Sequence, residues 1–354
     1  MAETADSSTD QKLTFYLPGL FSLQGDGGAT AGVSYRALET LLSRGEVVER
    51  QIPRGYEEGL FALFNLARQD NADLPVAAVT RMFDMGVIDK DWWLRADPVH
   101  LSLSRDRLIL ADARKLEVTP QEATRLVAEV MEVFKADGWL LKAPHPERWY
   151  LKPLKPPKLT TTTLSRVVGR DVHGFLPQGP DDKAWHTILN ELQILLHTAT
   201  ANAEREKNGK LPINSLWFWG SGRLPRITPV SWTRVWSNEP VTLSLAKLSG
   251  TAGGALPSDY ADWRRQSELT GEHLIILDEA HAACLYADAT GWHENLKKME
   301  QNWMEPLLND LQSGKVARAT LLTDAGIGYS ITPQQARRWW RWRRSLASQG
   351  RSAD

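Results

Sequence analysis

Short apolar runs alternate with helical patterns through the second half of the chain, and this alternation most constrains the fold. The runs cover residues 216–219, 241–247, 273–277 and 319–322, and each is as long as a buried strand. A helical pattern extends from about Trp292 to Leu311, between the last two runs. Strands that alternate with helices are typical of α/β proteins. We therefore expect an α/β fold with a largely parallel sheet flanked by helices.

The first half of the chain adds further strands and helices to this pattern. We expect strands at residues 13–17, 93–103 and 107–111, and helices near 35–42, 57–68, 75–85 and 185–197. Thr119 and Glu122 have the spacing of a capping box, with Pro120 at the first helical position. Apolar residues then recur on one helical face as far as Phe134. This signature predicts a helix that begins at Pro120.

A change in composition suggests how the chain divides. Residues 143–180 contain seven prolines and a run of four threonines, which favours irregular or edge-strand structure. A chain of 354 residues is long enough for about two domains. We expect a disordered tail at 1–11, a main domain from 12–90 and 226–354, and an inserted, smaller α+β subdomain at 91–225.

Charge and cysteine content exclude several functional classes. Lys and Arg number 42 against 43 Asp and Glu, so the net charge of −1 gives no strong signal for nucleic acid. Cys284 is the single cysteine, which excludes an internal disulfide and a Cys-rich zinc site. The polar first residues do not resemble a signal peptide, and no apolar run approaches the roughly 20 residues of a membrane-spanning helix. These features predict a cytoplasmic protein without a transmembrane segment.

One acidic motif follows a predicted strand. Residues 274–281 read Leu-Ile-Ile-Leu-Asp-Glu-Ala-His, like the Walker B box of helicases. An ATPase would also need a phosphate-binding GxxxxGK[ST] loop, and the sequence contains none. The carboxyl edge of a parallel sheet is nevertheless where α/β folds build sites. Candidates for a divalent metal site are therefore Asp278, Glu279, His281 and Asp324.

The chain contains 15 tryptophans against 7 tyrosines and 8 phenylalanines, and three of them lie in a basic C-terminal segment. Residues 337–344 read Arg-Arg-Trp-Trp-Arg-Trp-Arg-Arg. Such a segment could enter a membrane interface or stack on single-stranded nucleic acid. The simpler interpretation is that the Trp side chains dock on the domain and the Arg side chains point outward. We expect the simpler arrangement.

The string Trp217-Phe-Trp-Gly-Ser-Gly222 carries a resemblance to a known family, together with residues 190–214 and Leu94–His100. These segments resemble the archaeal-type cofactor-independent phosphoglycerate mutases, which have a similar succession of G-x-P-x-N and W-x-W-G-x-G. They are even more similar to bacterial RpfE-type proteins, described as mutase-like or regulatory. The resemblance covers residues 90–225 well.

The resemblance implies the alkaline phosphatase superfamily, with two divalent metals held by Asp and His and a transiently phosphorylated serine. The sequence departs from that pattern at three places. Leu17-Pro18-Gly19 follows the first strand where the family has a metal-binding Asp-Gly. Leu60 stands near the nucleophile position, after Glu58-Gly59, with no serine. Asp324 is followed by Ala325 where the family has Asp-His.

Three hypotheses follow from these observations. The first is a mutase-like pseudoenzyme without a cofactor, which binds a small anionic ligand or a protein partner and has a regulatory role. The second is an active mutase or phosphohydrolase with a rearranged Mn²⁺ or Zn²⁺ site. The third is a membrane- or nucleic-acid-interacting protein that uses residues 337–344. The candidate ligand contacts are Arg95, Asp97, His100, Arg170, Asp171, Asn202, Arg205, Asn214 and Trp219.

Overall fold

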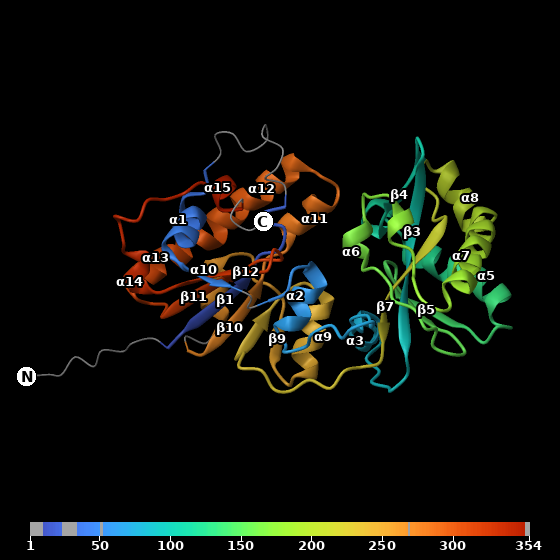
Figure 1. Ribbon diagram of the computed structural model, residues 1–354, viewed down its shortest axis with the longest axis horizontal. Coiled ribbons are helices and arrows are strands. Elements are labelled where there is room, and N and C mark those ends of the chain that lie inside the picture. Colours follow the sequence, from blue (N-terminus) through green and yellow to red (C-terminus); the bar gives the residue numbers. More distant parts are fainter. Residues whose placement is uncertain (1–9, 23–33, 50–51, 268–269, 351–354) are drawn as a thin grey trace, which may run out of the picture. The chain divides into compact units, whose positions relative to one another are not determined.

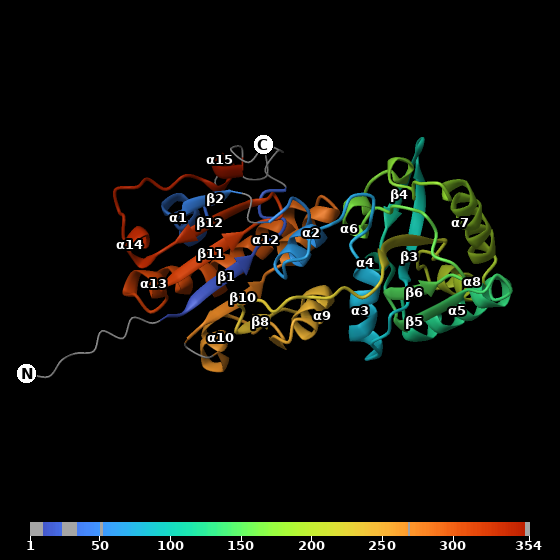
Figure 2. The same cartoon turned by 60° about the horizontal axis from the view of Figure 1, so that its bottom comes forward.

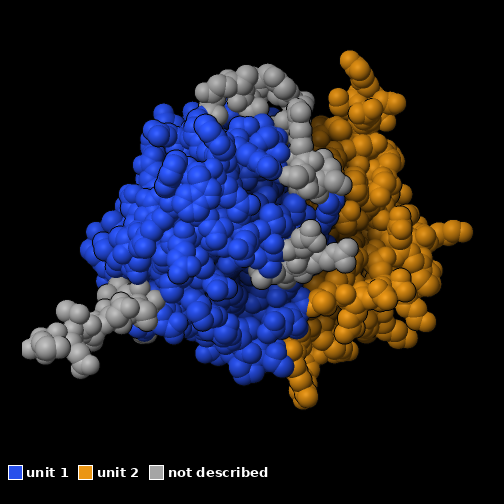
Figure 3. Space-filling model, turned by 60° about the vertical axis from the view of Figure 1, so that its left-hand side comes forward, with its two compact units in different colours: residues 1–66, 227–354 blue, residues 67–226 orange. Residues whose placement is uncertain are grey.

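The chain divides into two compact units in the computed structural model (Figure 1), which describes residues 10–22, 34–49, 52–267 and 270–350. Unit 1 comprises residues 1–66 and 227–354, and unit 2 comprises residues 67–226 (Figure 3). Unit 2 therefore begins at Ala67, earlier than the predicted boundary after residue 90. The reason is that helix α3 (Val76–Met85) packs on the sheet of unit 2.

Unit 1 is built on a seven-stranded sheet in the order β2-β12-β11-β1-β10-β8-β9. Five neighbouring strands are parallel, and β12 and β2 are antiparallel additions at one edge. The strands are β1 (Lys12–Tyr16), β2 (Glu46–Glu49), β8 (Arg234–Trp236), β9 (Ala252–Gly254), β10 (Glu272–Ile276), β11 (Arg318–Leu322) and β12 (Ile327–Ile331).

Helices cover both faces of this sheet. They are α1 (Arg36–Arg44), α2 (Tyr56–Ala62), α9 (Pro240–Leu248), α10 (Tyr260–Gln266), α11 (Glu279–Leu285), α12 (Ala289–Met299), the π-helical turn η2 (Glu300–Met304), α13 (Glu305–Ser313), α14 (Pro333–Ala336) and α15 (Leu346–Gly350). Helices α1, α12 and α13 (Figure 2) contribute apolar residues to one core, which also contains Phe15 and Ile275. Successive side chains of a strand point to opposite faces, so Tyr16 lies on the other face, under α2.

Unit 2 is an antiparallel sheet of five strands flanked by helices. The strands β4-β3-β6-β5 follow one another, and β7 also pairs with β3. They are β3 (Trp93–Ser104), β4 (Arg107–Ala111), β5 (Leu140–His145), β6 (Arg148–Lys152) and β7 (Ser215–Gly222). The remaining helices are α4 (Ala113–Leu116), α5 (Pro120–Phe134), α6 (Leu164–Val167), the 3₁₀ turn η1 (Val172–Gly174), α7 (Asp182–His197) and α8 (Thr200–Lys207).

The unit 2 core lies between the sheet and helices α5 and α7. The predicted capping box begins α5: the Thr119 hydroxyl accepts from the Glu122 N–H, and the Glu122 carboxylate accepts from the Thr119 N–H. The architecture confirms the predicted α/β fold, with a largely parallel sheet flanked by helices and a smaller inserted α+β unit.

Two predictions are wrong in detail, whereas the proline-rich stretch includes the end of the edge strand β5 and mostly irregular structure after β6, as expected. The apolar run 241–247 forms helix α9 rather than a strand, because Glu239 caps the helix and Pro240 occupies its first turn. The tail predicted at 1–11 includes Gln11, which is fully buried, whereas residues 1–9 lie outside the described residues.

The basic C-terminal segment also differs from expectation. Trp339, Trp340 and Trp342 are 82%, 62% and 89% exposed, so none of these side chains docks on the domain. Within the described ranges, no helix is long and apolar enough to cross a membrane.

Candidate functional site

Strands β3 and β7 bring three of the predicted site residues together in unit 2. Arg95 lies opposite Trp219, and Asp97 lies opposite Trp217, in their antiparallel register. Because side chains alternate along a strand, these residues share the face that is turned away from α5 and α7. Phe218, between the two tryptophans, points into the helix-covered core instead.

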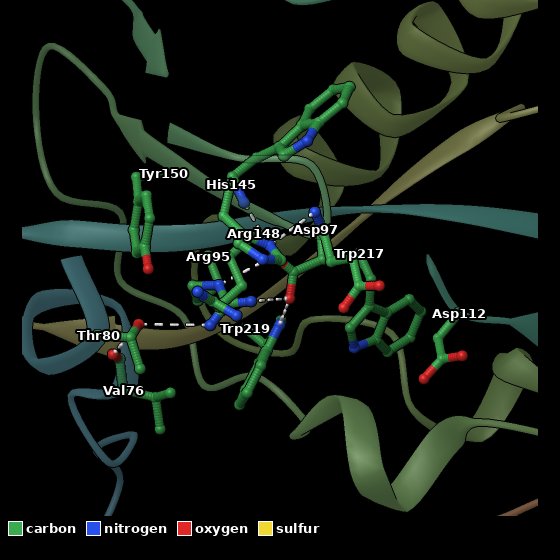
Figure 4. Close-up of polar contacts among 12 residues, drawn as sticks. Val76, Thr80, Arg95, Asp97, Asp112, His145, Arg148, Tyr150, Trp217 and Trp219 are labelled. Carbon is green, nitrogen blue, oxygen red and sulfur yellow. Dashed lines mark hydrogen bonds and ion pairs between the residues drawn. The ribbon is translucent and has the colours of Figure 1, made fainter. Parts of the chain in front are cut away.

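Asp97 is the centre of a buried polar network (Figure 4). Its carboxylate accepts two hydrogen bonds from Arg95, from Nε at 2.9 Å and from an Nη at 2.7 Å. The Trp219 indole N–H donates to the same group at 2.7 Å, and the backbone N–H of Trp149 donates at 3.1 Å. Thr80 of α3 accepts a further bond from Arg95. The network therefore joins β3, β6, β7 and α3.

Aromatic rings enclose the guanidinium of this pair. The Arg95 guanidinium carbon lies 5.1 Å from the ring centre of Trp219 and 5.4 Å from that of Tyr150. Side-chain exposure is 6% for Arg95 and 1% for Asp97. Burial raises the pKa of the Asp97 carboxyl, although Arg95 and Trp219 act in the opposite direction. Removal of one partner from such a pair leaves a buried charge uncompensated.

A second pair lies beside the first. The Arg148 guanidinium donates to both oxygens of Asp84, at 2.7 and 2.6 Å, and the Tyr150 hydroxyl also donates to Asp84. Burial opposes ionisation of Asp84, but the hydrogen bonds from Arg148 and Tyr150 outweigh it and lower the pKa. Arg95 with Asp97, and Arg148 with Asp84, thus form most of their hydrogen bonds within unit 2. The cluster is therefore a polar core rather than an open anion site.

Four other predicted contacts bond to the backbone. The His100 ring bonds to the Pro212 carbonyl, and Asn214 bonds both the N–H and the C=O of Leu101. Asn202 bonds the backbone of Leu196 and Ile213. The buried Arg205 donates to the Leu211 and Leu116 carbonyls and pairs with Glu122. In the structure these four side chains fix loops and helix ends.

Arg170 and Asp171 lie at the surface of unit 2. Asp171 accepts from the backbone of Leu108 and from the ring of His173, and its pKa is lowered, first by the bond to His173. The exposed guanidinium of Arg170 makes no hydrogen bond or ion pair within the described ranges. Among the predicted arginines, Arg170 is the one whose charge remains available to an anion.

The carboxyl edge of the unit 1 sheet holds a separate polar cluster. The Tyr56 hydroxyl donates to Oδ2 of Asp278 at 3.0 Å, and the Tyr56 ring stacks on His281, with 4.2 Å between ring centres. Nδ1 of His281 lies 3.9 Å from Oδ2 of Asp324. The backbone N–H of Gly19 donates to the other Asp324 oxygen at 3.0 Å.

Burial shifts the pKa values of three acids at this edge. It raises the pKa of Asp324 and of Glu279, and it raises the pKa of Glu239 to about 7. The charge of Asp278 also raises the pKa of Glu239 and of Glu279.

Two positions that the sequence analysis compared with the family's metal and nucleophile sites are closely packed. Leu60 is fully buried in α2. Gly19 lies so close to α11 that a Cβ would come within 2.7 Å of the His281 backbone. In the described part of the chain, no three His, Cys, Asp or Glu side chains gather as a metal site would require. Of the four candidate ligands, His281 and Asp324 approach each other, while Asp278 accepts a hydrogen bond from Tyr56.

A cavity of about 500 Å³ lies elsewhere in unit 1. Lys12, Glu272 and Arg318, the first residues of β1, β10 and β11, line it. These three residues lie at the amino ends of the parallel strands, and the lining continues along the sheet to Leu322, the last residue of β11.

Several residues of the two clusters were missed by the sequence analysis. Tyr56 and Glu239 in unit 1, and Thr80, Asp84 and Arg148 in unit 2, come from segments with no distinctive motif. Glu239 had one usable signal: an acidic residue directly before Pro240, which is the pattern of a helix N-terminus.

Part of this chain is similar in sequence to known phosphoglycerate mutases. No protein-family model matches the chain. A probable 2,3-bisphosphoglycerate-independent phosphoglycerate mutase of Geobacter sulfurreducens is 24% identical over 199 residues, which cover 54% of this chain and 49% of that protein. The corresponding mutase of Methanosarcina barkeri is 32% identical over 63 residues, or 18% of this chain and 16% of that protein. The match thus spans about half the length of the Geobacter relative.

A solved structure supports the fold. The PH0037 protein of Pyrococcus horikoshii has a TM-score of 0.50 and 14% identity to this chain, over 92% of this chain and 87% of that one. The likeness to PH0037 shows a shared fold, and the relatives found by sequence are 2,3-bisphosphoglycerate-independent phosphoglycerate mutases.

Proposed function

We propose that this chain is a phosphoglycerate-mutase-like protein without metal-dependent serine chemistry, which binds a small anionic ligand or a protein partner in a regulatory role. The observation that carries the proposal is the composition of the carboxyl edge in unit 1. Gly19 follows β1, Leu60 lies buried in α2, and Asp324 follows β11 with no histidine after it.

The chemistry of phosphoryl transfer supports this proposal. A two-metal site stabilises both the attacking and the leaving oxygen, and it needs several ionised ligands for each metal. Here one oxygen of Asp324 accepts from the Gly19 N–H, and Asp278 accepts from the Tyr56 hydroxyl.

The alternative is an active mutase or phosphohydrolase with a rearranged metal site. It requires Asp278, Glu279, His281 and Asp324 to converge on an ion. His281 and Asp324 are close, but Asp278 is held by Tyr56, and Glu279 shares no hydrogen bond with them in the described residues.

Arg170 is the group through which we expect an anion to bind. Its guanidinium is exposed, and a planar guanidinium suits a phosphate or a carboxylate. Arg95 and Arg205 already use their donors inside unit 2.

The deciding experiment combines metal analysis, a coupled mutase assay and a thermal-shift screen on the full chain. We expect no stoichiometric Mn²⁺ or Zn²⁺, no turnover, and stabilisation by 3-phosphoglycerate or 2-phosphoglycerate. Arg170→Ala should remove the thermal shift, and Arg125→Ala, an exposed arginine paired with Glu204, should retain it. Stoichiometric metal together with turnover that Asp278→Asn abolishes would refute the proposal in favour of the active enzyme.

A further inference from the structure

The Trp/Arg loop, defined as residues 337–345, displays apolar side chains that nothing in the described structure covers. Trp339, Trp340 and Trp342 are 82%, 62% and 89% exposed. Trp side chains are usually largely buried, and clustered exposed apolar side chains mark interaction sites. Leu103, Leu154 and Ile194 are also strongly exposed, but they lie far from one another in the sequence.

The loop is attached to unit 1 at both of its ends. Before it, the capping box of Thr332 and Gln335 fixes α14, and Arg337 Nε donates to the Gln312 carbonyl at 2.7 Å. After it, Leu346 is buried and its N–H donates to Glu39. The exposed tryptophans therefore lie in a bridge between two anchored points.

The charge of the loop is of one sign. It contains five arginines and no acidic residue. Arg343 donates to Ser34 and lies 3.5 Å from Glu39, and Arg341 contacts the Arg44 carbonyl. The guanidiniums of Arg338 and Arg344 make no hydrogen bond or ion pair with the described residues. The charges of these two arginines and the three exposed indole rings are thus available for contact with one partner.

We propose that the Trp/Arg loop binds the surface of a membrane that contains anionic lipids. Trp favours the level of the headgroups, where its ring is in apolar surroundings and its N–H is hydrated. Arginine pairs with phosphate groups and is attracted by the negative surface potential. The loop supplies both contributions within nine residues, without a membrane-spanning helix.

The geometry favours a lipid surface over single-stranded nucleic acid. The rings of Trp339 and Trp340 meet edge to face, at 87° and 6.0 Å between centres. Successive bases need ring faces on which to stack, together with a basic groove along the backbone. The net charge of −1 and the confinement of the arginine cluster to one loop do not match such a groove.

Co-sedimentation of the full chain with vesicles tests the proposal. We expect binding to vesicles of equal parts phosphatidylcholine and phosphatidylserine, weak binding to phosphatidylcholine alone, and loss of binding in high salt. Arg338→Glu with Arg344→Glu should weaken binding by at least about fivefold per arginine. Trp339→Ala, Trp340→Ala and Trp342→Ala together should abolish it.

The matched control is a triple variant at exposed apolar residues of unit 2, Leu103→Ala, Leu154→Ala and Ile194→Ala, which should bind vesicles as the wild type does. Circular dichroism and thermal unfolding should show that all variants are folded. Absence of binding to the anionic vesicles overturns the proposal. So does a loop-dependent shift of a single-stranded oligonucleotide, or loop-dependent self-association, in a protein that does not sediment with lipid.

Discussion

The indole N–H of Trp219 donates a 2.7 Å hydrogen bond to Asp97, from β7 to β3 and across 122 residues of sequence. The same carboxylate holds both ends of the Arg95 guanidinium fork. Strand pairing in unit 2 is therefore accompanied by a buried, charge-assisted contact. Hydrogen bonds to a charged group are stronger than those between neutral groups.

Trp219→Phe keeps an aromatic ring but removes the donor to Asp97. We expect the free energy of unfolding to fall by about 1.5–3 kcal/mol, as for a hydrogen bond to a charged group. Trp217→Phe is the matched control on the same strand, because Trp217 donates to the neutral carbonyl of Thr162. Its loss should be about 0.5–1.5 kcal/mol. Urea unfolding followed by far-ultraviolet circular dichroism measures both, and equal losses would contradict the argument.

Arg95→Met should leave Asp97 buried without its counter-charge, and we expect a loss of about 3–5 kcal/mol in unfolding free energy. The double variant Arg95→Met with Asp97→Leu should recover much of that loss, because no isolated charge remains. Arg125→Met removes the exposed pair with Glu204 and should have little effect. A double variant that is less stable than Arg95→Met alone would contradict this prediction, because the unpaired charge of Asp97 would then not be the main cause of the loss.

Glu239 should make stability depend on pH. Its pKa in the folded chain, about 7, lies above the ordinary value of 4.5, so the neutral form is favoured by folding. The stabilisation of the folded chain by the neutral Glu239 carboxyl is fully present below pH 4.5, and it is lost as the pH rises through about 7. In Glu239→Gln, we expect the free energy of unfolding to fall less between pH 4.5 and about 7 than it does in the wild type. Glu132→Gln, at an exposed position of α5, should show the wild-type profile in the same measurement.

Gly59→Ala tests the packing of α2 on the sheet. A Cβ at this position would lie 2.2 Å from the buried Tyr16 hydroxyl oxygen. We expect a loss of about 1–3 kcal/mol from overpacking, although Ala favours helix formation over Gly by about 1 kcal/mol. Tyr16→Phe removes that oxygen, so Gly59→Ala should lower the free energy of unfolding less in a Tyr16→Phe background than in the wild type. Gly174→Ala, with no heavy atom within 4 Å, should be close to neutral in thermal unfolding.

The sequence indicated those elements in which local chemistry and hydrophobic pattern agree. For α5, the capping box at Thr119 predicts where the helix begins, and the apolar face that follows predicts the helix itself. The run 241–247 was ambiguous, since a short apolar segment suits a buried strand and a buried helix alike. The carboxylate of Glu239, which caps α9, decided between them.

The polar clusters could not be assembled from the sequence in the same way. Arg95, Asp97 and Trp219 were chosen as ligand contacts, but their mutual hydrogen bonds depend on the register of β3 against β7. Tyr56 and Asp278 meet across 222 residues, and neither has a local pattern that points to the other. A residue type indicates what a side chain can bind, whereas the tertiary structure determines which partner it meets.

Strand β1 comes from the start of the chain, yet it pairs with β10 and β11, whose residues lie beyond position 271. Unit 2, in contrast, is one continuous segment with its own core. During synthesis on the ribosome, unit 2 can therefore fold while β1 still lacks both neighbours. We expect nascent chains that end before β10 to contain a protease-resistant unit 2 and a protease-sensitive amino-terminal segment.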